Sequence, residues 1–190
     1  FIGMEPQRFQ KQVLCELTPP LTEDGRSEFW ESLGRRFTGL PYQEADLLSQ
    51  KNKEFITSLF PESEIYLCLL DMQARLVLGR VGEHTVAAQH LLEKVGFTYL
   101  NEVDPFDGGP HYGAATSDIS VINKGQVRII GKAEKTSFRS IGLVGGIKNK
   151  RLVGGQTAYE IHEQEIFLPE RSLKVMGLAV GDKVFVSSLD

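Results

Sequence analysis

Two aspartates, Asp104 and Asp107, flank a turn-rich stretch that reads VDPFDGGP. Two carboxylates this close together can bind a guanidinium group through paired, charge-assisted hydrogen bonds. The same letters have a purely structural explanation, because an Asp-Gly pair favours a tight turn. Both interpretations stay open at this point. The candidate substrate-binding residues are Asp104, Phe106, Asp107, Gly108 and Gly109.

A histidine in a short loop is the candidate for proton transfer. His84 lies in the segment GRVGEHT, ahead of an expected helix. An imidazole titrates near neutrality and can move protons to or from a reacting amine. Alternatively, His84 only marks the start of that helix. His90 is interpreted as a packed or surface residue of the expected helix. His111 and His162 have no partner at metal-ligand spacing, so the sequence predicts no metal site.

The two cysteines and one tyrosine are expected to be structural. Cys15 and Cys68 are embedded in apolar letters, which favours buried free thiols in a reducing compartment over a disulfide. Tyr66 shares the second of these apolar segments. Core packing is the favoured explanation for it, over proton donation to a leaving thiolate.

Composition excludes several classes of protein. The chain has 190 residues, 24% of them charged and 41% hydrophobic, with a formal net charge of −4. Charges of both signs are interspersed, so neither nucleic acid nor an anionic membrane is an expected partner. No apolar run approaches the ~20 residues that span a bilayer. These features are typical of a globular protein, and we expect it in the cytoplasm.

The first 110 residues mix helices with a few strands. A β-rich stretch over 12–17 ends at a Pro-Pro pair, and Ser27 is placed to cap a helix over 28–36, with Glu31 assisting. Further helices are predicted over 43–48, 51–60, 71–78 and 85–95. The last of these stops at Gly96, and a strand follows over 97–103.

After residue 110 the pattern becomes β-rich. Short strands are predicted over 127–131, 140–144, 157–161, 165–168 and 183–187, with a helical turn or two over 169–176. The pairs Gly145-Gly146 and Gly154-Gly155 are interpreted as hairpin turns. We therefore expect an α+β chain: a mixed sheet with helices over 1–110, then a small β-barrel-like subdomain over 111–190.

Six motifs occur in an order that points to a known family. They read FWESLGRRF, ADLLS, NKEFI, IY, LLEKVGFTY and VDPFDGGP, between residues 29 and 110. Together they resemble arginine N-succinyltransferase, and VDPFDGGP carries the most distinctive part of the likeness. The resemblance is nearly continuous from about residue 13 to 110 and fades in the β-rich tail.

The resemblance implies a fold and a reaction. Such proteins are similar to the GNAT superfamily and transfer a succinyl group from succinyl-CoA to the α-amino group of L-arginine. They need no bound cofactor, and a glycine-rich loop at a helix N-terminus holds the pyrophosphate of the acyl donor. No such loop is recognisable here. The expectation is that this chain forms the acceptor-side half, joined by an N-terminal half or a partner subunit, in a homo- or hetero-oligomer.

One position departs from the family pattern. The resemblance implies a proton-donating histidine where this sequence has Gly82, with His84 two residues further on. A loop can carry His84 into the same space, which would preserve the chemistry. The alternative is that this chain is a non-catalytic subunit or paralogue that stabilises an active acyltransferase.

Overall fold

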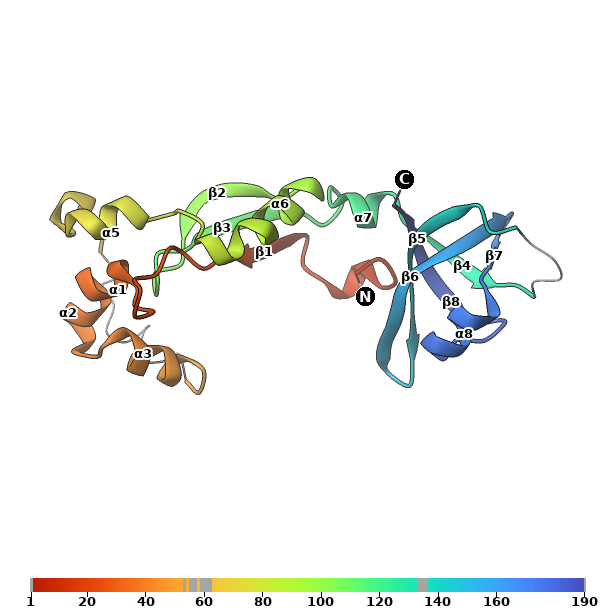
Figure 1. Cartoon of the computed structure of the whole chain (residues 1–190), viewed down its shortest axis with the longest axis horizontal. Coiled ribbons are helices and arrows are strands. Elements are labelled where there is room, and N and C mark those ends of the chain that lie inside the picture. The colour runs from red at the N-terminus through yellow and green to blue at the C-terminus, as the bar shows by residue number, and fades with distance from the viewer. Residues whose placement is uncertain (1, 53, 55–57, 59–62, 133–136, 190) are drawn as a thin grey trace. The chain divides into compact units, whose positions relative to one another are not determined.

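The computed structural model describes residues 2–52, 54, 58, 63–132 and 137–189 (Figure 1). It divides into two compact units, one formed by Leu14–Ala114 and the other by Phe1–Val13 together with Ala115–Asp190. The N-terminal stretch thus belongs with the β-rich tail. The domain boundary predicted from sequence, between residues 110 and 111, stays a prediction. The helix predicted over 51–60 falls largely outside the described residues.

The unit of residues 14–114 carries most of the helices. Its described α-helices are short, and the 3-10 turns η2 and η3 precede α5 and α6. The bounds are α1 Glu28–Ser32, α2 Gly34–Thr38, α3 Tyr42–Ser49, η2 Leu67–Leu69, α5 Met72–Val77, η3 Glu83–Thr85 and α6 Val86–Lys94.

The helix predicted over 28–36 is two helices. Ser27 caps the first as expected, accepting a hydrogen bond from Trp30 N at 3.1 Å. The chain then breaks at Leu33, whose φ and ψ are −121° and −69°. The Trp30 ring lies against Gly34, where a Cβ atom would come within 2.3 Å of it. Glu31 is not part of the cap, since its carboxylate accepts from Tyr42 N instead.

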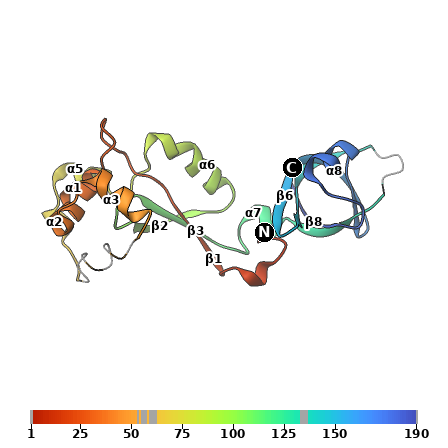
Figure 2. The ribbon, with the colours of Figure 1, turned by 90° about the horizontal axis from the view of Figure 1, so that it is seen from below.

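Three strands form the sheet that supports the turn over residues 104–109, called the acidic turn below because it carries Asp104 and Asp107. They are β1 Gln12–Glu16, β2 Thr98–Val103 and β3 Pro110–Ala115, in the order β1-β3-β2. Strands β2 and β3 are antiparallel, with Val103 opposite Pro110. Helix α6 lies along this sheet (Figures 1 and 2) and is tied to β3 by a hydrogen bond from Gln89 Nε2 to Tyr112 Oη at 2.9 Å.

The β-rich unit is a closed barrel. Its strands follow the order β4-β7-β6-β5-β8, and antiparallel pairing of β4 with β8 closes it (Figure 1). The bounds are β4 Gln126–Ile130, β5 Ser140–Lys148, β6 Arg151–His162, β7 Glu165–Phe167 and β8 Lys183–Ser188, with η1 Pro6–Arg8, α7 Ser120–Asn123 and α8 Glu170–Met176 outside the barrel. The α+β class and the barrel predicted from sequence are confirmed.

The glycine pairs in the barrel do not form hairpin turns, so that prediction is wrong. Gly145 lies opposite Gly154 within the ladder that joins β5 to β6. A Cβ atom at Gly154 would lie 2.6 Å from the Val144 carbonyl oxygen. Glycine is therefore required here by close approach of the two strands, whereas the turn itself comes later, at Asn149 and Lys150 with positive φ.

The expected burial of three side chains is also wrong. Cys68 is exposed, Cys15 is half-buried, and Tyr66 is 77% exposed. The sequence predicts all three in the core because their neighbours in sequence are apolar. Several of those neighbours, Leu67 and Leu69 among them, are themselves exposed.

Within the described residues, no helix has the length and apolar character to cross a membrane.

Candidate functional site

The acidic turn after β2 is built by its two aspartates. Asp104 N donates to Gly109 O, and Gly108 N donates back to Asp104 O, both at 2.8 Å. Asp104 Oδ1 accepts from Phe106 N at 2.7 Å, and Asp107 Oδ1 accepts from Gly109 N at 2.8 Å. Each carboxylate thus uses one oxygen to hold the turn. The second oxygen of each lies outside these bonds.

The two glycines of the turn are required by backbone geometry. Gly108 has a φ of +80°, a conformation that L side chains rarely adopt. A Cβ atom at Gly109 would lie 2.2 Å from the Leu17 carbonyl oxygen. Both residues therefore let the turn close against the chain that follows β1. They give the aspartates a fixed backbone.

Phe106 anchors the turn in the core. Its ring lies 4.6 Å from the Trp30 ring and 5.4 Å from the Tyr42 ring, centroid to centroid. Trp30 is fully buried, and its Nε1 donates to Leu40 O at 2.9 Å. The structure thus assigns Phe106 a packing contact that fixes where the turn sits.

Burial sets the electrostatics of the turn. The pKa of Asp107 is raised to about 6, mainly by desolvation; the hydrogen bond from Gly109 N opposes this rise, and the nearby Asp104 and Glu16 carboxylates add to it. Desolvation likewise raises the pKa of Tyr42 to about 12, with Asp107 contributing. A cation placed beside these carboxylates would relieve their repulsion. The turn is therefore suited to bind a positively charged group.

Three residues that the sequence analysis did not assign to the site lie beside the turn. Glu16 ends β1, Glu102 lies in β2, and His111 is the second residue of β3. His111 Nε2 is 3.9 Å from Glu16 Oε1, and His111 Nδ1 is 3.9 Å from Glu102 Oε2. His111 is thus not isolated, as its sequence neighbours suggested. Only the pairing of β1, β3 and β2 brings these groups together.

His84 lines a separate pocket of about 640 Å³. It belongs to the 3-10 turn η3 and is exposed. The walls come from this turn and from residues 18–25. Thr85 Oγ1 donates to Thr18 O at 3.0 Å and so ties the two walls together. The exposed His84 side chain is thus accessible from this pocket.

The neighbouring Gly82 leaves no space for a side chain. Gly82 N donates to Thr18 O at 2.9 Å. A Cβ atom on Gly82 would lie 2.6 Å from the Pro19 carbonyl oxygen. The histidine that the family resemblance implies at this position therefore does not fit the backbone of this chain.

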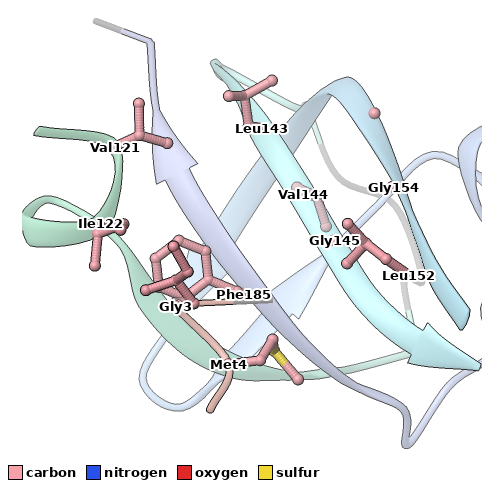
Figure 3. A pocket seen from close by; sticks show the side chains of 12 residues that line it. Gly3, Met4, Val121, Ile122, Leu143, Val144, Gly145, Leu152, Gly154 and Phe185 are labelled. Carbon is pink, nitrogen blue, oxygen red and sulfur yellow. The ribbon is translucent and has the colours of Figure 1, made fainter. Parts of the chain in front are cut away.

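The barrel unit has a pocket of its own, of about 500 Å³ (Figure 3). Hydrophobic side chains line most of it, including Met4, Leu143 and Phe185. Gly145 and Gly154, which pair across β5 and β6, also face it. The strand–loop–helix setting of a phosphate-binding loop is not found at these glycines.

The structure is that of an α+β protein with a closed five-stranded barrel and a turn that carries two aspartates. The family model described as arginine N-succinyltransferase beta subunit matches residues 1–121. The arginine N-succinyltransferase of Yersinia pestis is 33% identical to this chain and that of Photorhabdus laumondii 32%, each aligned with 100% of this chain and 56% of its own length. The chain therefore belongs to the arginine N-succinyltransferase family.

A solved structure agrees with this assignment. The arginine/ornithine succinyltransferase subunit AI from Pseudomonas aeruginosa superposes with a TM-score of 0.78 at 26% identity, over 100% of this chain and 54% of that one. The chain thus spans about half the length of the relatives it matches. Family and fold are predicted correctly from the sequence motifs.

Proposed function

We propose that this chain is the acceptor-side part of an enzyme that transfers a succinyl group from succinyl-CoA to the α-amino group of L-arginine. The observation that carries the proposal is the acidic turn of Asp104 and Asp107. Both carboxylates are held by backbone hydrogen bonds, and each keeps an oxygen for a ligand. A guanidinium presents planar, paired donors that match two such acceptors.

The donor belongs to the part of the enzyme that this chain does not contain. The relatives extend over nearly twice the aligned length. We assign the succinyl-CoA site to that remainder, as a further segment or a partner subunit, in a homo- or hetero-oligomer in the cytoplasm. No bound cofactor is needed for the chemistry. Nucleic acid and membranes are not partners in this proposal.

The reaction requires that the α-amine be positioned against the thioester carbon and that protons be transferred. Once neutral, the α-amine attacks the thioester carbon from about 3 Å, and backbone N–H groups stabilise the oxyanion of the tetrahedral intermediate. The amine then loses a proton, and the departing thiolate gains one. His84, which is exposed and lines its pocket, is the group in this chain that we assign to carry that proton.

A non-catalytic subunit is the second candidate, and one observation favours it. Gly82 stands where the family resemblance implies a histidine, and the Pro19 carbonyl fills the space beside it. Against this, proteins named arginine N-succinyltransferase align with all of this chain. The catalytic proposal is therefore preferred.

Thiol release from succinyl-CoA, with and without L-arginine, tests the proposal. The assay uses the whole protein together with any subunit that accompanies it. Arginine-dependent release that falls about 10²-fold or more in His84→Ala would support both the activity and the proton carrier. Release that survives in this variant would overturn only the role of His84. Absence of arginine-dependent release in the wild type would overturn the catalytic proposal.

A further inference from the structure

We propose that Glu16, Asp104 and His111 form a binding site for a divalent transition-metal ion. Each of the three side chains offers a ligand atom, and these atoms all lie within 4.8 Å of one another. One imidazole nitrogen and two carboxylate oxygens are a donor set that Zn²⁺, Co²⁺ and Fe²⁺ bind well.

The sheet holds the three ligands at one edge. Glu16 is the last residue of β1, Asp104 directly follows β2, and His111 is the second residue of β3, which lies between them. Leu17 N donates to Pro110 O at 3.1 Å, which fixes the end of β1 against the start of β3. The ligand positions are therefore set by strand pairing and do not depend on a mobile loop.

His111 supplies an independent indication of a ligand. Its side chain is 14% exposed, and Nε2 is a buried atom with no hydrogen-bond partner among the residues that the structure describes. Unsatisfied buried nitrogen atoms are rare and costly. This atom lies 3.9 Å from Glu16 Oε1. Metal ligands around one ion stand roughly 3.3 Å apart, so small side-chain rotations would complete the site.

Glu102 lies next to the other nitrogen of the His111 ring, Nδ1. Its Oε2 lies 3.9 Å from His111 Nδ1, the ring nitrogen that the metal would not use. Metal-binding histidines commonly donate their second N–H to a carboxylate, which orients the ring and strengthens it as a ligand. A metal-free explanation also exists, in which the His111 ring only lies between the carboxylates of Glu16 and Glu102. The two explanations differ in what they predict for added metal.

The metal ion and the substrate arginine would compete for Asp104. Asp104 is a ligand in this site and also one of the two carboxylates assigned to the guanidinium, so this step rests on the proposed function. A divalent ion beside the turn would also repel a cationic substrate. Binding of the metal would thus inhibit the binding of arginine competitively.

Direct titration with Co²⁺ tests the site without any use of activity. The protein is treated with a chelator and carries Cys15→Ser and Cys68→Ser, so that thiolates do not contribute. We expect one saturable site with a visible absorption band, weakened by more than about tenfold in His111→Gln and by about tenfold in Glu102→Gln. His90→Gln, an exposed histidine on α6, is the matched control and should bind as the parent does.

Several outcomes would overturn the proposal. These are the absence of a saturable signal in the parent, or equal affinity in parent and His111→Gln. Glu16→Gln guards against misfolding, because Glu16 is exposed and its replacement leaves the core untouched; it must also weaken binding. Competition is a separate arm, in which Co²⁺ should raise the KM for arginine at constant kcat. An unchanged KM would overturn only the claim that metal and arginine compete. Absence of arginine-dependent activity would overturn the proposed function. In that case the Co²⁺ titration would still test the metal site.

Discussion

The Asp107 carboxyl is held in an environment that favours its neutral form. Its pKa is raised from 3.8 to about 6, mainly by burial. Because the folded state keeps this proton to a higher pH than the unfolded chain does, the contribution of Asp107 to stability is greatest below about pH 4 and declines as the pH rises through 6. At neutral pH the ionised group opposes folding, so its presence suggests a role in binding.

Asp107→Asn should therefore separate stability from binding. The amide oxygen can still accept from Gly109 N, while the buried charge is removed. We expect the variant to gain free energy of unfolding at pH 7.5, by at most about 3 kcal/mol, and to lose that gain by pH 4. The KM for arginine should rise about tenfold or more. Urea unfolding at both pH values and initial rates measure these effects; a variant less stable at pH 7.5 would contradict the argument.

Gly82 is fixed by its contact with the Pro19 carbonyl. A methyl group there would meet backbone atoms at 2.6 to 3.0 Å, which have little room to move. We expect Gly82→Ala to lower the free energy of unfolding by about 1 to 3 kcal/mol, and Gly82→His to lower it further. Gly155→Ala is the matched control, since a Cβ at Gly155 meets nothing within 4 Å. Thermal or urea unfolding of the three variants measures this, and a stable Gly82→His with higher activity would refute it.

Among the elements, α1 and the acidic turn are joined by one hydroxyl group. Ser27 Oγ accepts from Trp30 N at the start of α1 and donates to Asp107 O at 2.9 Å. The residue is fully buried, so its loss leaves both partners unsatisfied. Ser27→Ala should cost about 1 to 3 kcal/mol and raise the KM for arginine, whereas Ser27→Thr keeps the hydroxyl. An unchanged KM in a destabilised Ser27→Ala would show that the turn is held by other contacts.

Elements governed by local chemistry could be read from the sequence. Ser27 caps α1, Gly96 follows α6 with positive φ, and several barrel strands lie where alternation placed them. Long-range packing could not be read in this way. The break at Leu33 depends on the Trp30 ring meeting Gly34, and the paired glycines of β5 and β6 depend on strand approach.

The same division holds within the candidate site. Asp104 and Asp107 were visible because both lie in one motif with a recognisable turn. Glu16, Glu102 and His111 were not, since they belong to three strands whose register no local pattern specifies. The strand that carries His111, Pro110–Ala115, was itself not predicted, because a turn-rich stretch leads into it.

At the scale of the whole molecule, the barrel and the unit of residues 14–114 have separate hydrophobic cores. In the barrel, Asp182 Oδ2 accepts from Lys148 Nζ and from Ala179 N, each at 2.8 Å. These bonds, led by the one from Lys148, lower the pKa of Asp182. The stability they contribute is therefore present above about pH 4 and is lost as the pH falls through the lowered pKa.

Removing the Asp182 charge should change one unit and spare the other. In Asp182→Asn we expect weaker acid dependence of unfolding and a loss of about 1 kcal/mol or less at neutral pH, because both partners are partly exposed and screened by solvent. Hydrogen exchange should quicken at the amides of β5 and β8. Amides of α6 and β2 should keep their protection, since these elements belong to the other compact unit, Leu14–Ala114. Faster exchange in both units would mean that they unfold as one cooperative body.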